Sequence, residues 1–111
     1  MKHALLIDTE TLQQNLGQPG LVIIDVRGRA AYEFGGHIPG AVHSTWHDYS
    51  DPNAVPKGLL DPNRERMEQK IRALGISQDS DVVIYSNPFD NWGDEGRMFW
   101  MLEYLGHTRL R

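Results

Sequence analysis

The chain alternates short apolar runs with segments whose apolar residues recur at helical spacing. Residues 21–26 and 81–85 are largely apolar without alternation, which is typical of parallel strands covered on both faces. Residues 5–7 and 41–43 are shorter runs that we also expect to form strands. This order of elements favours an α/β fold in which a parallel sheet of four to five strands has helices on both faces.

Two of the predicted helices are short. Asp8 or Thr9 is in position to cap a helix that carries Leu12 and Leu16 one turn apart. A second short helix is expected over residues 29–34. Residues 48–62 are rich in Asp, Pro, Asn and Gly, so they are expected to form a long surface connection.

The clearest helix signal lies in residues 61–75, with Asp61 expected as the N-cap and Pro62 as the first helical residue. Glu68 and Arg72 are one turn apart and should pair on the solvated face. The apolar stripe consists of Met67, Ile71 and Leu74.

A further helix is predicted over residues 96–105, where nearly every residue is apolar. We therefore expect this helix to be buried and Trp100 to belong to the core. Residues 107–111 follow where an α/β chain begins another strand, so residues 1–111 are expected to be a single domain whose last strand is truncated. An open sheet edge would then allow two copies to associate as a homo-oligomer.

Composition excludes several classes of function. Fifteen Asp and Glu against eleven Lys and Arg give a net charge of −4, which counts against nucleic-acid and anionic membrane partners. The apolar runs are too short to span a bilayer, and Asp8 comes too early for a secretory signal, so a cytoplasmic location is expected. The absence of cysteine excludes a thiol nucleophile, a cysteine zinc site and a disulfide within the chain.

Asp25 and Arg27 lie at the carboxyl end of the strand over residues 21–26, which is where open α/β sheets place their sites. We expect Arg27 to pair with Glu33, or as a second choice with Asp25, and thereby to fix the turn. A general-base role for Asp25 would require a perturbed environment, which a sequence does not reveal.

Three histidines, His37, His43 and His47, lie close together in the sequence. His43 and His47 are four residues apart, a spacing that suits a metal site on a helix. However, His43 falls in or just after a strand, and no matching pair of ligands recurs. We therefore interpret these residues as turn or surface histidines and expect no metal and no cofactor.

Residues 25–27, together with the string 36–41 (Gly-His-Ile-Pro-Gly-Ala), resemble the signature of the rhodanese (sulfurtransferase) homology domain. Residues 81–85 are similar to the strand that precedes the family's catalytic loop, and residues 96–107 to the helix behind it. The chain is most similar to the N-terminal, non-catalytic half of tandem thiosulfate or 3-mercaptopyruvate sulfurtransferases. The residues that we interpret as its structural motif are Asp25, Arg27, Glu33, His37, Pro39 and Gly40.

The sequence departs from the family at the catalytic position. In catalytic members a cysteine follows the fourth strand directly, but Ser86 stands there in this chain. A serine hydroxyl does not carry a persulfide, and the acidic residues of the loop repel anions, so we expect no catalytic residue and no activity of the chain alone. The residues predicted to form an interface or pocket loop are Ser86, Phe89, Asn91, Trp92 and Asp94.

The resemblance implies that the chain shapes the substrate pocket of a cysteine-bearing C-terminal rhodanese domain, which belongs to the same or another chain. Two alternatives remain open at this point. The first is a free-standing inactive rhodanese-fold module that binds or regulates other proteins. The second is an enzyme of another mechanism that uses Asp25, His37 or Ser86.

Overall fold

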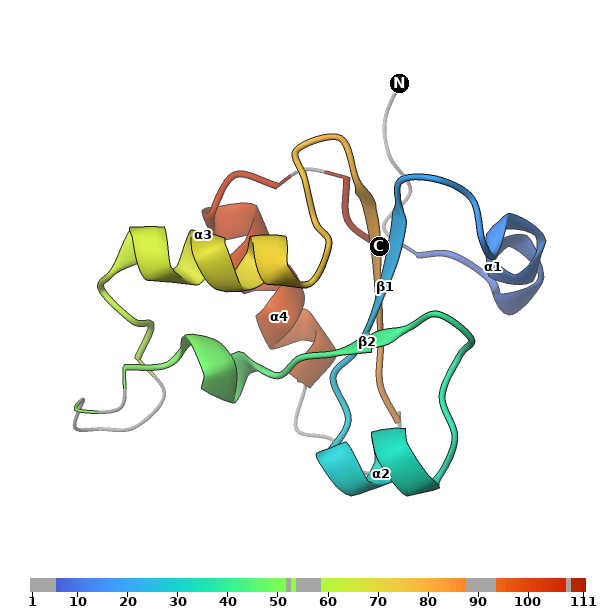
Figure 1. The fold of residues 1–111 in the computed structure, drawn as a ribbon, viewed down its shortest axis with the longest axis horizontal. Coiled ribbons are helices and arrows are strands. Elements are labelled where there is room, and N and C mark those ends of the chain that lie inside the picture. Colours follow the sequence, from blue (N-terminus) through green and yellow to red (C-terminus); the bar gives the residue numbers. More distant parts are fainter. Residues whose placement is uncertain (1–5, 52, 54–58, 88–93, 108) are drawn as a thin grey trace.

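The computed structural model describes residues 6–51, 53, 59–87, 94–107 and 109–111, and it consists of helices that alternate with short strands (Figure 1). In chain order the elements are α1 (Thr9–Asn15), β1 (Leu21–Asp25), α2 (Arg29–Phe34), β2 (Val42–His43), the 3₁₀ helix η1 (Trp46–Tyr49), α3 (Arg64–Ala73), β3 (Asp81–Tyr85) and α4 (Asp94–Tyr104). None of the helices in the described ranges is long and apolar enough to span a bilayer.

The sheet is parallel, with β1 in the centre between β2 and β3. Asp25, the last residue of β1, is level with His43 of β2 and with Tyr85 of β3. Leu110 adds a parallel bridge to Val82 of β3. The predicted α/β class with a parallel sheet is thus confirmed, with three strands and this bridge among the described residues.

Residues 109–111 lie along the edge of β3 that faces away from β1. The Val82 N–H donates to the Arg109 carbonyl at 2.8 Å, and the Arg111 N–H donates back to the Val82 carbonyl at 2.9 Å. The Ile84 N–H donates to the Arg111 carbonyl at 2.8 Å. This segment therefore pairs as a strand does, as its sequence position predicts.

The start of the chain differs from the prediction of a strand over residues 5–7. Residue 5 lies outside the described residues, and Leu6 and Ile7 are not part of the sheet. They lead directly into α1, whose N-cap is Asp8, with its carboxylate accepting from the Thr11 N–H at 2.7 Å. Ile7 packs on the core beside Leu12 instead of pairing with a strand.

Two cores lie on opposite faces of the sheet, and neighbouring strand residues alternate between them. Ile24 and Val82 belong to the core covered by α3 and α4. Ile23 and Val83 belong to the core that contains Leu12 of α1. Figure 1 shows α3 and α4 on one side of the sheet and α1 on the other. Burial on both faces explains why β1 and β3 lack polar alternation.

The start of α3 corrects a prediction. Asn63, not Asp61, is the N-cap, and its side chain accepts from the Arg66 N–H at 3.0 Å. Asp61 is only 3% exposed, and its carboxylate does not cap the helix because it accepts from the Asn63 N–H and binds the Arg66 guanidinium. The predicted pair of Glu68 with Arg72 is present, with 3.7 Å between the charged groups.

Helix α4 also corrects a prediction, because it is buried on one face only. Met98, Met101 and Leu102 are buried against the sheet. Trp100 and Tyr104 are 52% and 58% exposed and stack on each other, so Trp100 is not a core residue. The physical reason is that a single sheet covers one side of a helix, and residues 100 and 104 share the opposite side.

Candidate functional site

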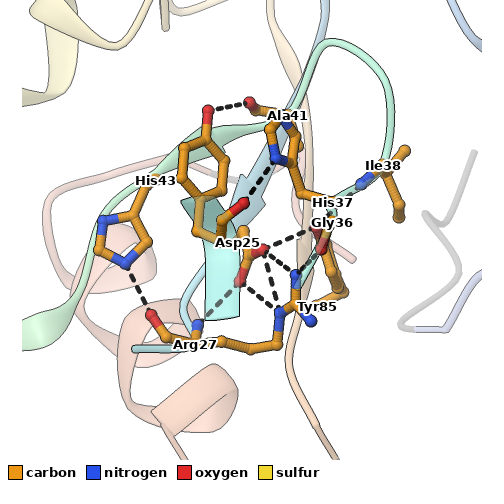
Figure 2. Close-up of polar contacts among 9 residues, drawn as sticks. Asp25, Arg27, Gly36, His37, Ile38, Ala41, His43 and Tyr85 are labelled. Carbon is orange, nitrogen blue, oxygen red and sulfur yellow. Dashed lines mark hydrogen bonds and ion pairs between the residues drawn. The ribbon is translucent and has the colours of Figure 1, made fainter. Parts of the chain in front are cut away.

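A network of polar side chains lies at the carboxyl ends of β1 and β3, which we call the carboxyl edge of the sheet (Figure 2). Asp25 is fully buried there. Its carboxylate accepts from the Arg27 backbone N–H at 2.9 Å and from Nε and Nη2 of the Arg27 side chain at 3.0 and 2.7 Å. The Tyr85 hydroxyl donates to the same carboxylate at 2.8 Å. These partners allow a charge in a buried position, where an unpaired carboxylate is strongly disfavoured.

The observed partner of Arg27 is the second choice from the sequence, so the expectation of Glu33 is wrong. Glu33 accepts from Arg29 at 3.0 Å on the exposed face of α2. Glu33 follows Arg29 by one helical turn, whereas Arg27 precedes the helix and turns toward the buried carboxylate. The Nη2 atom of Arg27 also donates to the Gly36 carbonyl at 2.7 Å, which attaches the segment after α2 to the network.

Tyr85 connects the network to the turn that follows Gly36. Its hydroxyl accepts from the Ile38 N–H at 3.1 Å while it donates to Asp25. The Ala41 N–H donates to the Ile38 carbonyl at 2.9 Å, and Gly40 has a φ of 84°. Residues 38–41 therefore form a type II turn, which favours proline at the second position and glycine at the third, as this sequence has.

Two histidines, His37 of the motif and His43 of β2, contact backbone carbonyls in this region. His37 Nδ1 lies 2.9 Å from the Tyr32 carbonyl oxygen, and its ring stacks on the Tyr32 ring at 4.0 Å between centroids. His43 Nε2 lies 2.6 Å from the Arg27 carbonyl oxygen. His47 is separate from them and stacks on Trp46. Among the described residues, no group of three or more His, Asp or Glu side chains is placed to hold a metal ion.

The charges of the network are fixed at neutral pH. Burial raises the pKa of Asp25, but the hydrogen bonds from Arg27 and Tyr85 outweigh it, so the net pKa lies below its usual value. The hydrogen bond with Asp25 raises the pKa of Arg27, and burial raises the pKa of the Tyr85 hydroxyl. Asp25 is thus a stable anion with occupied lone pairs, which is the opposite of what a general base near neutrality needs.

The structure thus brings together most of the predicted motif, together with one residue that sequence reasoning missed. Asp25, Arg27, His37 and the turn at residues 38–41 share the carboxyl edge, whereas Glu33 lies outside the network. The missed residue is Tyr85. Its position as the last residue of a predicted strand indicated that it lies at the carboxyl edge. The register that sets it level with Asp25, however, is visible only in the structure.

Beside the network, a cleft of about 370 Å³ opens at the carboxyl ends of β1 and β2, with Arg29, His43 and His47 in its lining. A larger groove of about 750 Å³ lies away from this edge, between α3 and the end of α4. The predicted loop begins with Ser86, which is half-buried directly after β3, and Asp94 is the first residue of α4. Phe89, Asn91 and Trp92 lie outside the described residues.

Comparison with known proteins identifies related chains. The family model described as "Rhodanese-like domain" matches residues 8–111. The chain is 33% identical over 105 residues to a thiosulfate sulfurtransferase of Pseudomonas aeruginosa, a match that covers 93% of this chain and 36% of that protein. It is 31% identical over 108 residues to the sulfur carrier protein TtuD of Thermus thermophilus, with 96% and 36% covered. The chain therefore spans little more than a third of the length of these relatives.

The fold is also similar to that of a solved enzyme. The crystal structure of SseA from Escherichia coli, described among 3-mercaptopyruvate sulfotransferases, matches with a TM-score of 0.77 and 26% identity. The match covers 96% of this chain and 43% of the SseA chain. The fold described above is thus also present as part of a longer chain.

Proposed function

The chain belongs to the rhodanese-like domain family, and we propose that it is the non-catalytic half of a two-domain sulfurtransferase. In this role it lines the substrate pocket of a second, cysteine-bearing domain. The length of its relatives supports a place in a longer protein, because the chain covers 36% of the P. aeruginosa enzyme and 43% of the SseA chain.

The observation that carries the proposal is the residue after β3. The family resemblance places a cysteine there, and this chain has Ser86 and no cysteine at any position. Sulfur transfer through a persulfide needs a thiolate that attacks the sulfane sulfur of the donor and releases the rest of the donor as an anion. A serine hydroxyl ionises far less readily, and it does not form a persulfide.

The polar network at the carboxyl edge supports a scaffold role. Asp25, Arg27 and Tyr85 are committed to one another and to the backbone at Gly36 and Ile38. Tyr85 immediately precedes the loop that the sequence assigns to the pocket. The network therefore fixes the point at which this loop leaves the sheet, which is what a pocket wall requires.

The first experiment measures sulfur transfer from thiosulfate to cyanide, and from 3-mercaptopyruvate, with the purified chain. We expect no turnover above a buffer blank. Ser86→Cys is expected to remain inactive, because Asp90, Asp94 and Glu95 disfavour an anionic donor at this loop. Robust turnover by the unmodified chain that Ser86→Ala abolishes would overturn the proposal.

The second experiment uses the protein produced from the complete coding sequence. Trp92→Ala is expected to raise KM for the sulfur donor several-fold with little change in kcat, while Gln69→Ala on α3 serves as the control with no effect. A coding sequence without a second, cysteine-bearing rhodanese domain would instead favour the free-standing binding module.

A further inference from the structure

Helices α3 and α4 cover the same side of the sheet (Figure 1). Their outer faces differ in chemistry. The outer face of α3 carries ion pairs, with Glu68 3.1 Å from Arg64 and 3.7 Å from Arg72. The outer face of α4 carries Trp100 and Tyr104, which are 52% and 58% exposed and stack at 5.7 Å between ring centroids, and the exposed Glu103 lies next to Tyr104 in the sequence. Two adjoining large rings are unusual on a helix face that meets only water, so this part of α4 has the character of a covered surface.

Toward the start of α4 the two exposed rings are followed by Arg97 and Trp46, which are partly buried. Arg97 precedes Trp100 by three residues and Tyr104 by seven, so the three side chains form one stripe along α4. The guanidinium of Arg97 lies over the ring of Trp46 in η1 at 4.2 Å. We call Trp46, Arg97, Trp100 and Tyr104 the aromatic surface. It joins η1, beside the cleft at the carboxyl edge, to the length of α4.

We propose that the aromatic surface is the docking site of the cysteine-bearing domain of the same longer protein. This inference rests on the proposed function. The larger part of the SseA chain lies outside the region that matches this fold, so a protein of that plan holds enough further chain for a second domain beside it. Helix α4 directly follows the loop that we propose to line the shared pocket, so a domain that meets this loop also lies near the start of α4.

The chemistry of the surface defines what it fits. Trp, Tyr and Arg are the residues that most often dominate binding energy at protein interfaces, because they bury a large area and still offer a polar group. The stacked pair of Trp100 and Tyr104 fits an apolar patch on the second domain. The guanidinium of Arg97, which lies over the ring of Trp46, adds a charged group at the rim of that surface.

The test is photo-crosslinking in the protein produced from the complete coding sequence. Trp100→p-benzoylphenylalanine is expected to give intramolecular crosslinks to peptides of the cysteine-bearing domain. The matched control, Gln69→p-benzoylphenylalanine on the exposed face of α3, is expected to give none. Crosslinks from position 100 only to a second copy or to the residues just after Arg111, or no crosslink at all, would overturn the proposal.

A stability measurement gives a second, independent reading. Trp100→Gln combined with Tyr104→Gln is expected to lower the Tm of the complete protein by at least about 3 °C and to separate the unfolding of the two domains. In the chain of residues 1–111 the same pair of changes affects exposed side chains, so a Tm change of less than about 3 °C is expected. Equal effects in the two proteins would contradict docking at this surface.

Sulfurtransferase assays of the same complete protein separate this inference from the proposed function. An active enzyme without crosslinks from position 100 overturns the docking site and leaves the proposed function in place. Crosslinks to a second domain in a protein that transfers no sulfur would support the docking site and overturn the proposed function.

Discussion

Asp25 and Asp61 are two buried aspartates that the chain holds by the same local arrangement. They are 0% and 3% exposed. Each accepts a hydrogen bond at 2.9 Å from the backbone N–H two residues later. Each also binds Nε and Nη2 of an arginine, Arg27 for Asp25 and Arg66 for Asp61.

The two sites differ in how far their other partners lie along the chain. Asp25 accepts from Tyr85, 60 residues away, and Arg27 continues to the Gly36 carbonyl. The partners of Asp61 named above lie within five residues of it. The side chain of Arg27 is 21% exposed, whereas that of Arg66 is 51% exposed. At Asp25 the carboxylate and its partners therefore connect β1, β3 and the turn at residues 38–41. At Asp61 the same local arrangement connects residues at the start of α3.

The largest effect should follow from Asp25→Asn. The change leaves the guanidinium of Arg27 without its counter-ion in a mostly buried position, and it turns an amide N–H₂ toward other donors. We expect the free energy of unfolding in urea to fall by about 3 kcal/mol or more. Asp79→Asn, at an exposed residue, is the control and should have little effect. A loss below about 1 kcal/mol would mean that Asp25 does not hold the polar network of the carboxyl edge together.

A smaller loss is expected for Tyr85→Phe, which removes only the hydroxyl between Asp25 and the Ile38 N–H. The free energy of unfolding should fall by about 1–2 kcal/mol, because a partly buried N–H loses its acceptor. Tyr104→Phe makes the same chemical change on an exposed ring and should leave the urea midpoint unchanged. Equal effects of the two changes would remove the long-range link that distinguishes Asp25 from Asp61.

Arg66→Gln tests the site at Asp61. At neutral pH it should lower the free energy of unfolding by less than Tyr85→Phe does, because the Arg66 side chain is half exposed. The hydrogen bond from Arg66 lowers the pKa of Asp61 to about 2. A carboxyl whose pKa is lower in the folded than in the unfolded protein adds stability above its unfolded pKa, and this stability is lost as the pH falls toward 2.

The measurement for Arg66→Gln is the urea midpoint between pH 6 and pH 2. The difference between the original chain and the variant should be largest above pH 4 and should shrink toward pH 2. Asp25 keeps its own partners in both proteins, so the stability lost when Asp25 is protonated is the same in both and cancels in this difference. Parallel curves over the whole range would contradict the role assigned to Arg66.

The pattern of apolar residues predicted β1, β3 and the parallel sheet, because burial on both faces leaves a direct mark in the sequence. It did not predict which acid Arg27 binds, because Asp25 and Glu33 are both near Arg27 in the sequence and the burial of Asp25 is visible only in the structure. The helix pattern also failed for Trp100. The number of apolar residues in α4 suggested burial all round, but a helix beside one sheet is covered on one face only.

The start of α3 shows a similar ambiguity between neighbouring residues. Asp61 and Asn63 are both residue types that favour the N-cap position. Arg66 binds the Asp61 carboxylate, so Asn63 caps the helix instead. Tyr85 was missed because its function depends on register. Its hydroxyl meets Asp25 because the last residues of β1 and β3 are level, and register between two parallel strands joined by a long crossover is not encoded in the local pattern of either strand.

The smallest effect is expected for Glu33→Gln, which tests the choice that the sequence favoured. Glu33 and Arg29 form an exposed pair one turn apart on α2, so the loss should be less than about 0.5 kcal/mol and should vanish at high salt. Arg29→Gln should have the same small effect, and the double variant should add nothing further. A loss above about 1 kcal/mol that persists when Arg29 is already replaced would mean that Glu33 reaches Arg27 in solution. Asp25 would then share its arginine, and the contrast with Asp61 would rest on Tyr85 alone.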